Sequence, residues 1–218
     1  MVQKQKNKEL KTVAIIVAHP DDETLWAGGT MLGQPYWQWY TVCLCRGSDE
    51  DRAPKFYEAQ KKLGSTGFIG DLDDGPEQRP LDEKLVEQAI LALLPTERFD
   101  LIISHSPFGE YTKHIRHEEV GKAVIKLWSA NKISANELWI FAYEDSNKAY
   151  NPKPIKYATI FHTLSKRIWQ EKYRIITETY GFTKSGFEAQ TTPESEAFWQ
   201  FTNPQDVERW LNNKRISA

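Results

Sequence analysis

Two segments far apart in the chain carry histidines and acids at close spacing. The first reads HPDDE over residues 19–23, and the second reads HSPFGEYTKHIRHEE over residues 105–119. In the first turn of a helix, His114 and His117 would lie on one face, because residues three apart are neighbours there. Histidines and an acid, with one position left open for water, form the ligand set of catalytic zinc. The two segments therefore predict a metal site, provided that the fold brings them together.

The adjacent acids Asp21 and Asp22 have two interpretations. Either one could cap the helix that follows, because aspartate is a favoured N-cap residue. One cap does not require two acids, so the second carboxylate could serve as a general base beside a metal-bound water. His114 and His117, taken alone, could be ordinary surface histidines.

An alternation of apolar strands and amphipathic helices would position both segments. It predicts a Rossmann-like α/β fold, a mostly parallel sheet with helices on both faces in a single domain. In the common strand order 3-2-1-4-5, the first and fourth strands meet where the order reverses, and ligands bind at that point. The two histidine-bearing segments follow those two strands. The predicted strands are 13–18, 40–45, 66–69, 99–104 and 138–143, and the predicted helices are 53–63, 81–94 and 118–128.

The carboxy-terminal part of the chain has a weaker pattern. Residues 157–163 and 173–179 are predicted as strands and residues 164–171 as a helix between them. No Gly/Ser/Pro-rich stretch marks a linker, so these residues are expected to belong to the same domain.

Composition argues against several classes of partner. The chain has 218 residues, with 28 Lys+Arg and 30 Asp+Glu. This balance leaves no basic surface for nucleic acid. The amino terminus is charged, and the apolar run 13–18 is too short for a signal peptide or a membrane span. Cys43 and Cys45 would share one strand face, where a disulfide would be strained, so they are expected to be buried and reduced in the cytoplasm.

The stretch AHPDDETLWAGGT, followed by SPFGEYTKHIRHEE, resembles the LmbE-like/PIG-L family of zinc-dependent N-acetyl-sugar deacetylases. Leu63-Gly64 and Asp74-Gly75 lie where that family has comparable features, so the resemblance spans about residues 11–145. It implies one domain over residues 1–218, with 155–218 as an elaboration. It is compatible with a homo-oligomer.

The resemblance also implies roles for individual residues. His19, Asp22 and His117 would bind Zn²⁺, or another divalent metal. Asp21 would be the general base, and a protonated His114 would hold the oxyanion.

One position departs from the family pattern. The family's usual second motif is His-Pro-Asp-His, whereas this chain has Arg116 in place of the acid. Glu110 or Glu118 would then have to orient His114.

The implied reaction is hydrolysis of the N-acetyl group of an N-acetylglucosamine-type substrate or conjugate. Arg52 and Asp74 are expected to contact sugar hydroxyls, although a solvated arginine and an Asp-Gly turn are equally good interpretations. Trp26 is the tryptophan most expected to stack on a sugar. A non-catalytic metal- or sugar-binding protein and a hydrolase of another amide stay open. A dinucleotide-binding protein is disfavoured, because no G-x-G-x-x-G follows the first strand.

Overall fold

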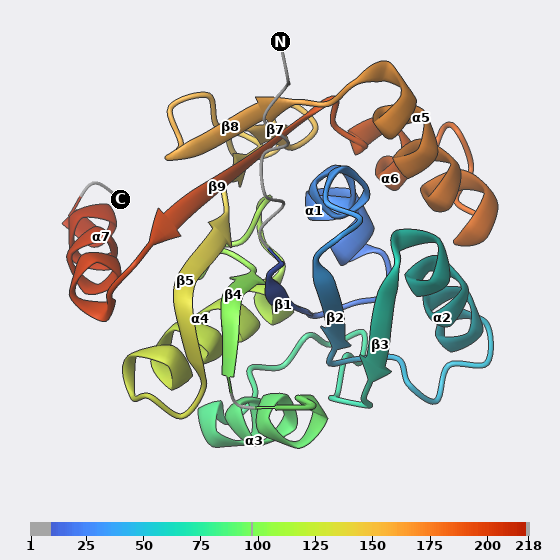
Figure 1. Cartoon of the computed structure of the whole chain (residues 1–218). Coiled ribbons are helices and arrows are strands. Elements are labelled where there is room, and N and C mark those ends of the chain that lie inside the picture. Colours follow the sequence, from blue (N-terminus) through green and yellow to red (C-terminus); the bar gives the residue numbers. More distant parts are fainter. Residues whose placement is uncertain (1–9, 97, 217–218) are drawn as a thin grey trace, which may run out of the picture.

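A seven-stranded sheet forms the centre of the molecule (Figure 1). The structure is a computed structural model and describes residues 10–96 and 98–216. The strand order is β3-β2-β1-β4-β5-β9-β8, which contains the predicted order 3-2-1-4-5. The first five strands run parallel, and β9 and β8 are antiparallel additions. The strands are β1 (Thr12–Val17), β2 (Gln38–Cys43), β3 (Ser65–Ile69), β4 (Arg98–Ser104), β5 (Ser134–Phe141), β8 (Ile160–Thr163) and β9 (Ser195–Phe201).

Helices cover both faces of the sheet, as predicted (Figure 1). Strand β1 shows why this requires a continuous apolar run: Val13 and Ile15 pack into one core, and Ala14 and Ile16 pack into the other. One face carries α1 (Asp22–Gly33), α2 (Arg52–Leu63), α5 (Lys166–Arg174) and α6 (Phe187–Thr191); the other carries α3 (Glu83–Leu93), α4 (Ile115–Ser129) and α7 (Pro204–Ile216).

The carboxy-terminal predictions are partly wrong. The helix expected at 164–171 is α5, and β8 occupies part of the strand expected at 157–163. The strand expected at 173–179 does not form, because α5 continues into a π-helical turn, η1 (Ile175–Thr179). Ile175 and Ile176, whose apolar side chains suggested a strand, pack into the core from this turn. Strand β9 was not predicted, and a small hairpin of β6 (Tyr143–Glu144) and β7 (Lys153–Pro154) adds a second sheet.

Cys43 and Cys45 are buried and free, as expected, but they do not share a face. Strand β2 ends at Cys43, so the alternation stops there, and Cys45 packs into the opposite core. Within residues 10–96 and 98–216, no helix has both the length and the apolar character needed to span a bilayer. The charged segment 1–9 lies outside the described residues.

The switch point of the sheet places the two histidine-bearing segments at one edge. Strands β1 and β4 are parallel neighbours, with Ile16 opposite Ser104, so the chain leaves both strands on the same side. Gly121 then allows α4 to lie against the turn after β4. A Cβ atom there would come within 2.5 Å of the His105 carbonyl oxygen. This close approach brings the first turn of α4 to the end of β1.

Candidate active site

Four of the five histidines gather at this edge, as the sequence predicts. The ring centroids of His105 and His117 are 4.0 Å apart, those of His114 and His117 are 4.3 Å apart, and those of His19 and His114 are 4.6 Å apart. The fifth, His162, lies elsewhere, beside Glu196. His114 is the residue before α4 and His117 is in its first turn, which explains their stacked rings.

Two of these histidines and Asp22 present ligand atoms at nearly equal separations. His19 Nδ1 lies 3.2 Å from Asp22 Oδ2 and 3.3 Å from His117 Nε2, and the latter two atoms are 3.3 Å apart. A tetrahedral zinc ion with bonds of about 2.0–2.2 Å separates its ligand atoms by about 3.3–3.6 Å. The triangle formed by His19, Asp22 and His117 therefore has the size that zinc requires.

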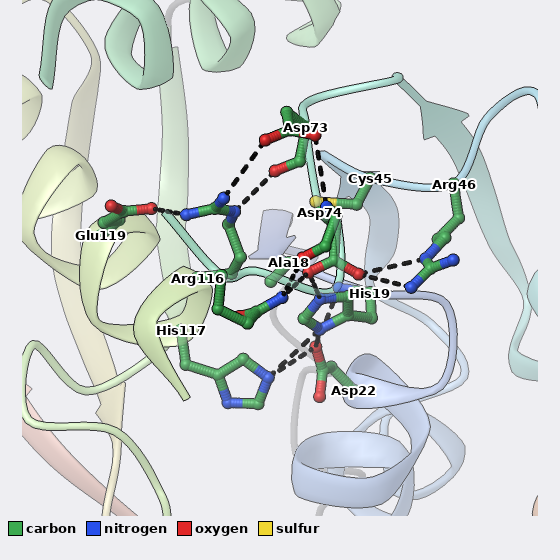
Figure 2. A network of polar contacts seen from close by, with 12 residues as sticks. Ala18, His19, Asp22, Cys45, Arg46, Asp73, Asp74, Arg116, His117 and Glu119 are labelled. Atoms are coloured by element: carbon green, nitrogen blue, oxygen red, sulfur yellow. Dashed lines mark hydrogen bonds and ion pairs between the residues drawn. The ribbon is translucent and has the colours of Figure 1, made fainter. Parts of the chain in front are cut away.

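A carboxylate is hydrogen-bonded to the second nitrogen of His117, and another lies in ion-pair contact with the second nitrogen of His19, which has no hydrogen-bond partner among the described residues. His117 Nδ1 lies 2.7 Å from Glu110 Oε2, and His19 Nε2 lies 3.3 Å from Asp74 Oδ1. A carboxylate that accepts one ring N–H fixes the tautomer and leaves the opposite nitrogen free for a metal. These contacts leave His117 Nε2 and His19 Nδ1 available, and both atoms point at Asp22 (Figure 2). The donor set therefore fits a divalent metal.

His105 supports the site but was not predicted as part of it. Burial lowers its pKa, and the charges of Glu110 and Asp22 raise it above the usual value. However, the amide N–H of Ala18 donates to Nε2 over 3.0 Å, and that hydrogen bond requires an unprotonated Nε2. The hydrogen bonds therefore favour a neutral ring that donates Nδ1–H to Glu110 over 2.9 Å. With its Nε2 lone pair engaged, His105 is a poorer ligand than His19.

Glu110 is the other residue that sequence reasoning placed wrongly. Either Glu110 or Glu118 was expected to orient His114, but Glu110 accepts from His105, His117 and the amide of Ser106 (2.7 Å). Its burial is complete. The signal that could have found it is a carboxylate five residues after one histidine and seven before another.

Asp21 has the most unusual backbone of the site. Its φ of 114° lies in the region that favours glycine, and the residue makes no side-chain cap to α1. The helix-cap interpretation therefore fails for Asp21. Glu23, which is buried, accepts the Asp21 N–H (3.2 Å) and is itself held by the hydroxyl of Tyr180 (2.7 Å). Burial, and then the charge of Asp22, raises the pKa of Asp21 well above its usual value.

Comparisons with known proteins agree with this geometry. The PIG-L family model, described as GlcNAc-PI de-N-acetylase, matches residues 14–128, more than half of the chain. The chain belongs to the PIG-L family. This confirms the family inferred from HPDDE and from the segment that ends in His117.

Individual relatives are distant. Uncharacterized protein L374 of Acanthamoeba polyphaga mimivirus is 24% identical over 184 residues, which cover 77% of this chain and 75% of that protein. N,N'-diacetylchitobiose deacetylase of Pyrococcus horikoshii, solved with an inhibitor, has a TM-score of 0.67 at 16% identity, covering 88% of this chain and 84% of that one. The 4-carboxy-2-hydroxymuconate hydratase GalB of Pseudomonas putida has a TM-score of 0.53 at 16% identity, covering 95% and 89%. The structural matches show a shared fold.

The surroundings of His114 in this PIG-L chain do not favour the protonated form that the resemblance implies. Burial, followed by the nearby His117 and His19, lowers the pKa of His114 to about 3. Its Nδ1 is buried and has no hydrogen-bond partner among the described residues. Glu118 is turned outward to Lys122 (3.1 Å). These surroundings favour the neutral imidazole at His114.

A cavity of about 330 Å³ opens beside the triangle. Asp21, His114 and Arg52 line it together with Phe187 and Glu188 from α6. The elaboration of the domain thus contributes directly to the walls of this site.

Two expectations about substrate contacts change. Asp74 also lines the cavity, but its carboxylate already accepts from Arg46 (2.7 Å) and Gln78 (2.8 Å) and lies against His19. Trp26, the expected sugar platform, is 0% exposed. It is a core residue, and its Nε1–H donates to Asp22 Oδ1 (3.1 Å).

Proposed function

We propose that this PIG-L protein is a metal-dependent N-deacetylase that hydrolyses the acetamide of an N-acetylglucosamine-type substrate or conjugate. The observation that carries the proposal is the triangle of His19, Asp22 and His117, with a carboxylate behind each imidazole and Asp21 in the adjoining cavity. The family model describes a de-N-acetylase and supports the same reaction. Zn²⁺ is the metal we expect, although the same ligands suit other divalent ions.

The protein's own groups supply the proton transfers. When bound, zinc would lower the pKa of a water ligand toward about 7 and polarise the carbonyl. Asp21 takes a proton from the attacking water and returns it to the leaving nitrogen, so that water and amide become acetate and a free amine. His114, as a neutral ring, donates an N–H to the oxygen that becomes negative in the transition state.

Arg52 is proposed to bind the sugar. Its guanidinium lies 4.6 Å from the centre of the Phe182 ring, which holds it at the cavity wall by a cation–π contact. Asp74 is proposed to act on the sugar mainly by orienting Arg46, which also lines the cavity.

Arg116 does not support a non-catalytic role. The replacement of an acid by arginine in the second motif could have blocked the metal site with a positive charge. Instead, the side chain turns away from His117 toward Asp73 and Glu119 (Figure 2).

Metal analysis and an acetate-release assay test the proposal together. Purified protein should carry about one divalent ion per chain, and His19→Ala and His117→Ala should lose most of it. The wild type should release acetate from at least one N-acetylglucosamine conjugate when zinc is added. Full occupancy in both variants would contradict the ligand assignment. Tight zinc binding without acetate release from any acetylated amino sugar would favour a binding protein.

A further inference from the structure

Arg116 is a buried cation that the proposed reaction does not use. Arg116 is 0% exposed, and it precedes the proposed metal ligand His117 in the sequence. Burying an arginine is costly unless its N–H groups are all engaged, so its partners indicate its role. Neighbouring residues on a helix point in different directions, so Arg116 cannot face the metal with His117.

Arg116 binds the segment between β3 and α3 and one acid of its own helix, α4. Nε donates to the Asp73 carbonyl oxygen (2.6 Å), and Nη2 donates to the Arg79 carbonyl oxygen (2.9 Å). Nη1 donates to Glu119 Oε2 (2.6 Å), and Glu119 Oε1 in turn accepts the amide N–H of Leu81 (2.8 Å). Two side chains of α4 thus hold the backbone of an irregular segment at three points. We refer to residues 73–81 as the clamped loop.

The clamped loop delivers Asp74 to the metal site. Asp74 directly follows the residue that accepts from Arg116 Nε, and its side chain is only 7% exposed. Oδ1 lies 3.3 Å from His19 Nε2, and Oδ2 accepts two hydrogen bonds from Arg46. Figure 2 shows this chain of contacts from Glu119 and Arg116 through Asp73 to Asp74 and His19.

A planar guanidinium suits this position better than an ammonium group. Its donors form a rigid fork, which reaches two carbonyl groups and a carboxylate at once, whereas a lysine offers one point charge. A carboxylate behind a metal-bound imidazole fixes the ring and typically contributes 10–100-fold in metal affinity.

We infer that Arg116 is a positioning residue of the metal site, which holds the clamped loop so that Asp74 orients His19. The family's usual acid at this position was expected to orient His114; in this chain the same position acts on a metal ligand instead. The inference rests on the metal site proposed above.

The dissociation constant for Zn²⁺, measured by competition with a fluorescent chelator, tests the inference without an activity assay. Asp74→Asn should weaken zinc binding about 10–100-fold. Arg116→Met should weaken it about 10-fold, because the loop survives but no longer fixes Asp74. The double variant should bind no more weakly than Asp74→Asn, since both changes remove the same contact. If Arg116→Met instead caused a general structural defect, the double variant would bind zinc more weakly than Asp74→Asn.

Arg79→Ala is the matched control. Arg79 gives only its main-chain oxygen to Arg116, and its side chain is exposed, so this variant removes an arginine and leaves the clamp intact. Its zinc affinity should match that of the wild type. If Arg116→Met does not fold, Arg116→Lys replaces it in the test. This variant keeps the positive charge but lacks the forked N–H donors of the guanidinium, so it should also weaken zinc binding.

The inference is wrong if a folded Arg116 variant binds zinc as tightly as Arg79→Ala. It is also wrong if the losses in the double variant multiply. Failure of the wild type itself to bind zinc would instead overturn the proposed function.

Discussion

Replacing Glu110 by glutamine should weaken both the apo protein and its metal site. Glu110 Oε2 accepts hydrogen bonds from the ring N–H groups of His117 (2.7 Å) and His105 (2.9 Å), and Oε1 accepts one from the amide N–H of Ser106. A glutamine can keep the bond to Ser106, but its NH₂ group then meets two ring N–H donors. Hydrogen bonds to an ionised group contribute about 1.5–3 kcal/mol each, so the loss of two lowers the free energy of unfolding by about 3–6 kcal/mol.

Linkage gives a second measure of the same interaction. Burial raises the pKa of Glu110, but contacts with His105 and His117 outweigh burial and lower the pKa to about 2 from its usual 4.5. Because the folded pKa is depressed, the contribution is complete above about pH 4.5 and is lost as the pH falls toward 2.

The metal site should respond through the tautomer of His117. A glutamine NH₂ group favours a ring that accepts at Nδ1 and carries its proton on Nε2, the atom that faces Asp22. We therefore expect about 10–100-fold weaker zinc binding.

Urea unfolding in the presence of a chelator, from pH 3 to pH 7, measures the stability effect. The difference between wild type and Glu110→Gln should be largest at pH 7 and shrink below pH 4.5. Glu118→Gln is the control on a neighbouring surface site. Its carboxylate pairs with Lys122, so it should cost no more than about 1 kcal/mol. A Glu110→Gln protein with wild-type stability and zinc affinity would refute the reasoning.

Three further predictions concern other parts of the structure. His114→Ala should retain zinc and lose about 10²–10³-fold in kcat. Because the pKa of His114 is lowered to about 3, the variant should not shift the pH profile of the rate between pH 5 and 8. Loss of zinc would mean that His114 is a ligand. Arg52→Ala should raise KM with little change in kcat, and an unchanged KM would remove Arg52 from the substrate site. Glu196→Gln should lower the free energy of unfolding by about 3–5 kcal/mol, because it leaves the buried Lys172 (2.7 Å) unpaired, while zinc content stays at the wild-type level; a drop in zinc would show coupling to the site.

Local pattern was sufficient for much of the fold. The apolar run that begins at Val13 and the helical spacing of apolar residues up to Trp128 are clear signals, because β1 and α4 pack against the core. The segment 173–179 misled because its apolar residues are consistent with a strand or a buried helical turn, and only the packing of η1 against the core distinguishes them.

The proposed ligand residues could be singled out from the sequence because they occur in two short motifs. The contacts of their supporting residues could not, because these contacts depend on how the loops fold and, for Asp74 and Arg116, on segments far apart in the sequence. Glu110 faces His105 and His117 only through the course of its loop, and Asp74 reaches His19 from the segment that follows β3. The same holds for Arg116, whose partners were set by the clamped loop.

The adjacent acids provide the most direct test of the catalytic account. The measurement is the rate of acetate release by Asp21→Asn and Asp22→Asn as free zinc is increased, with the zinc content of both proteins followed in parallel. We predict that Asp22→Asn binds zinc weakly and partly recovers its rate in excess zinc. Asp21→Asn should keep near-normal zinc and remain at least about 10²–10⁴-fold slower at every concentration. Wild-type turnover by Asp21→Asn would contradict the account.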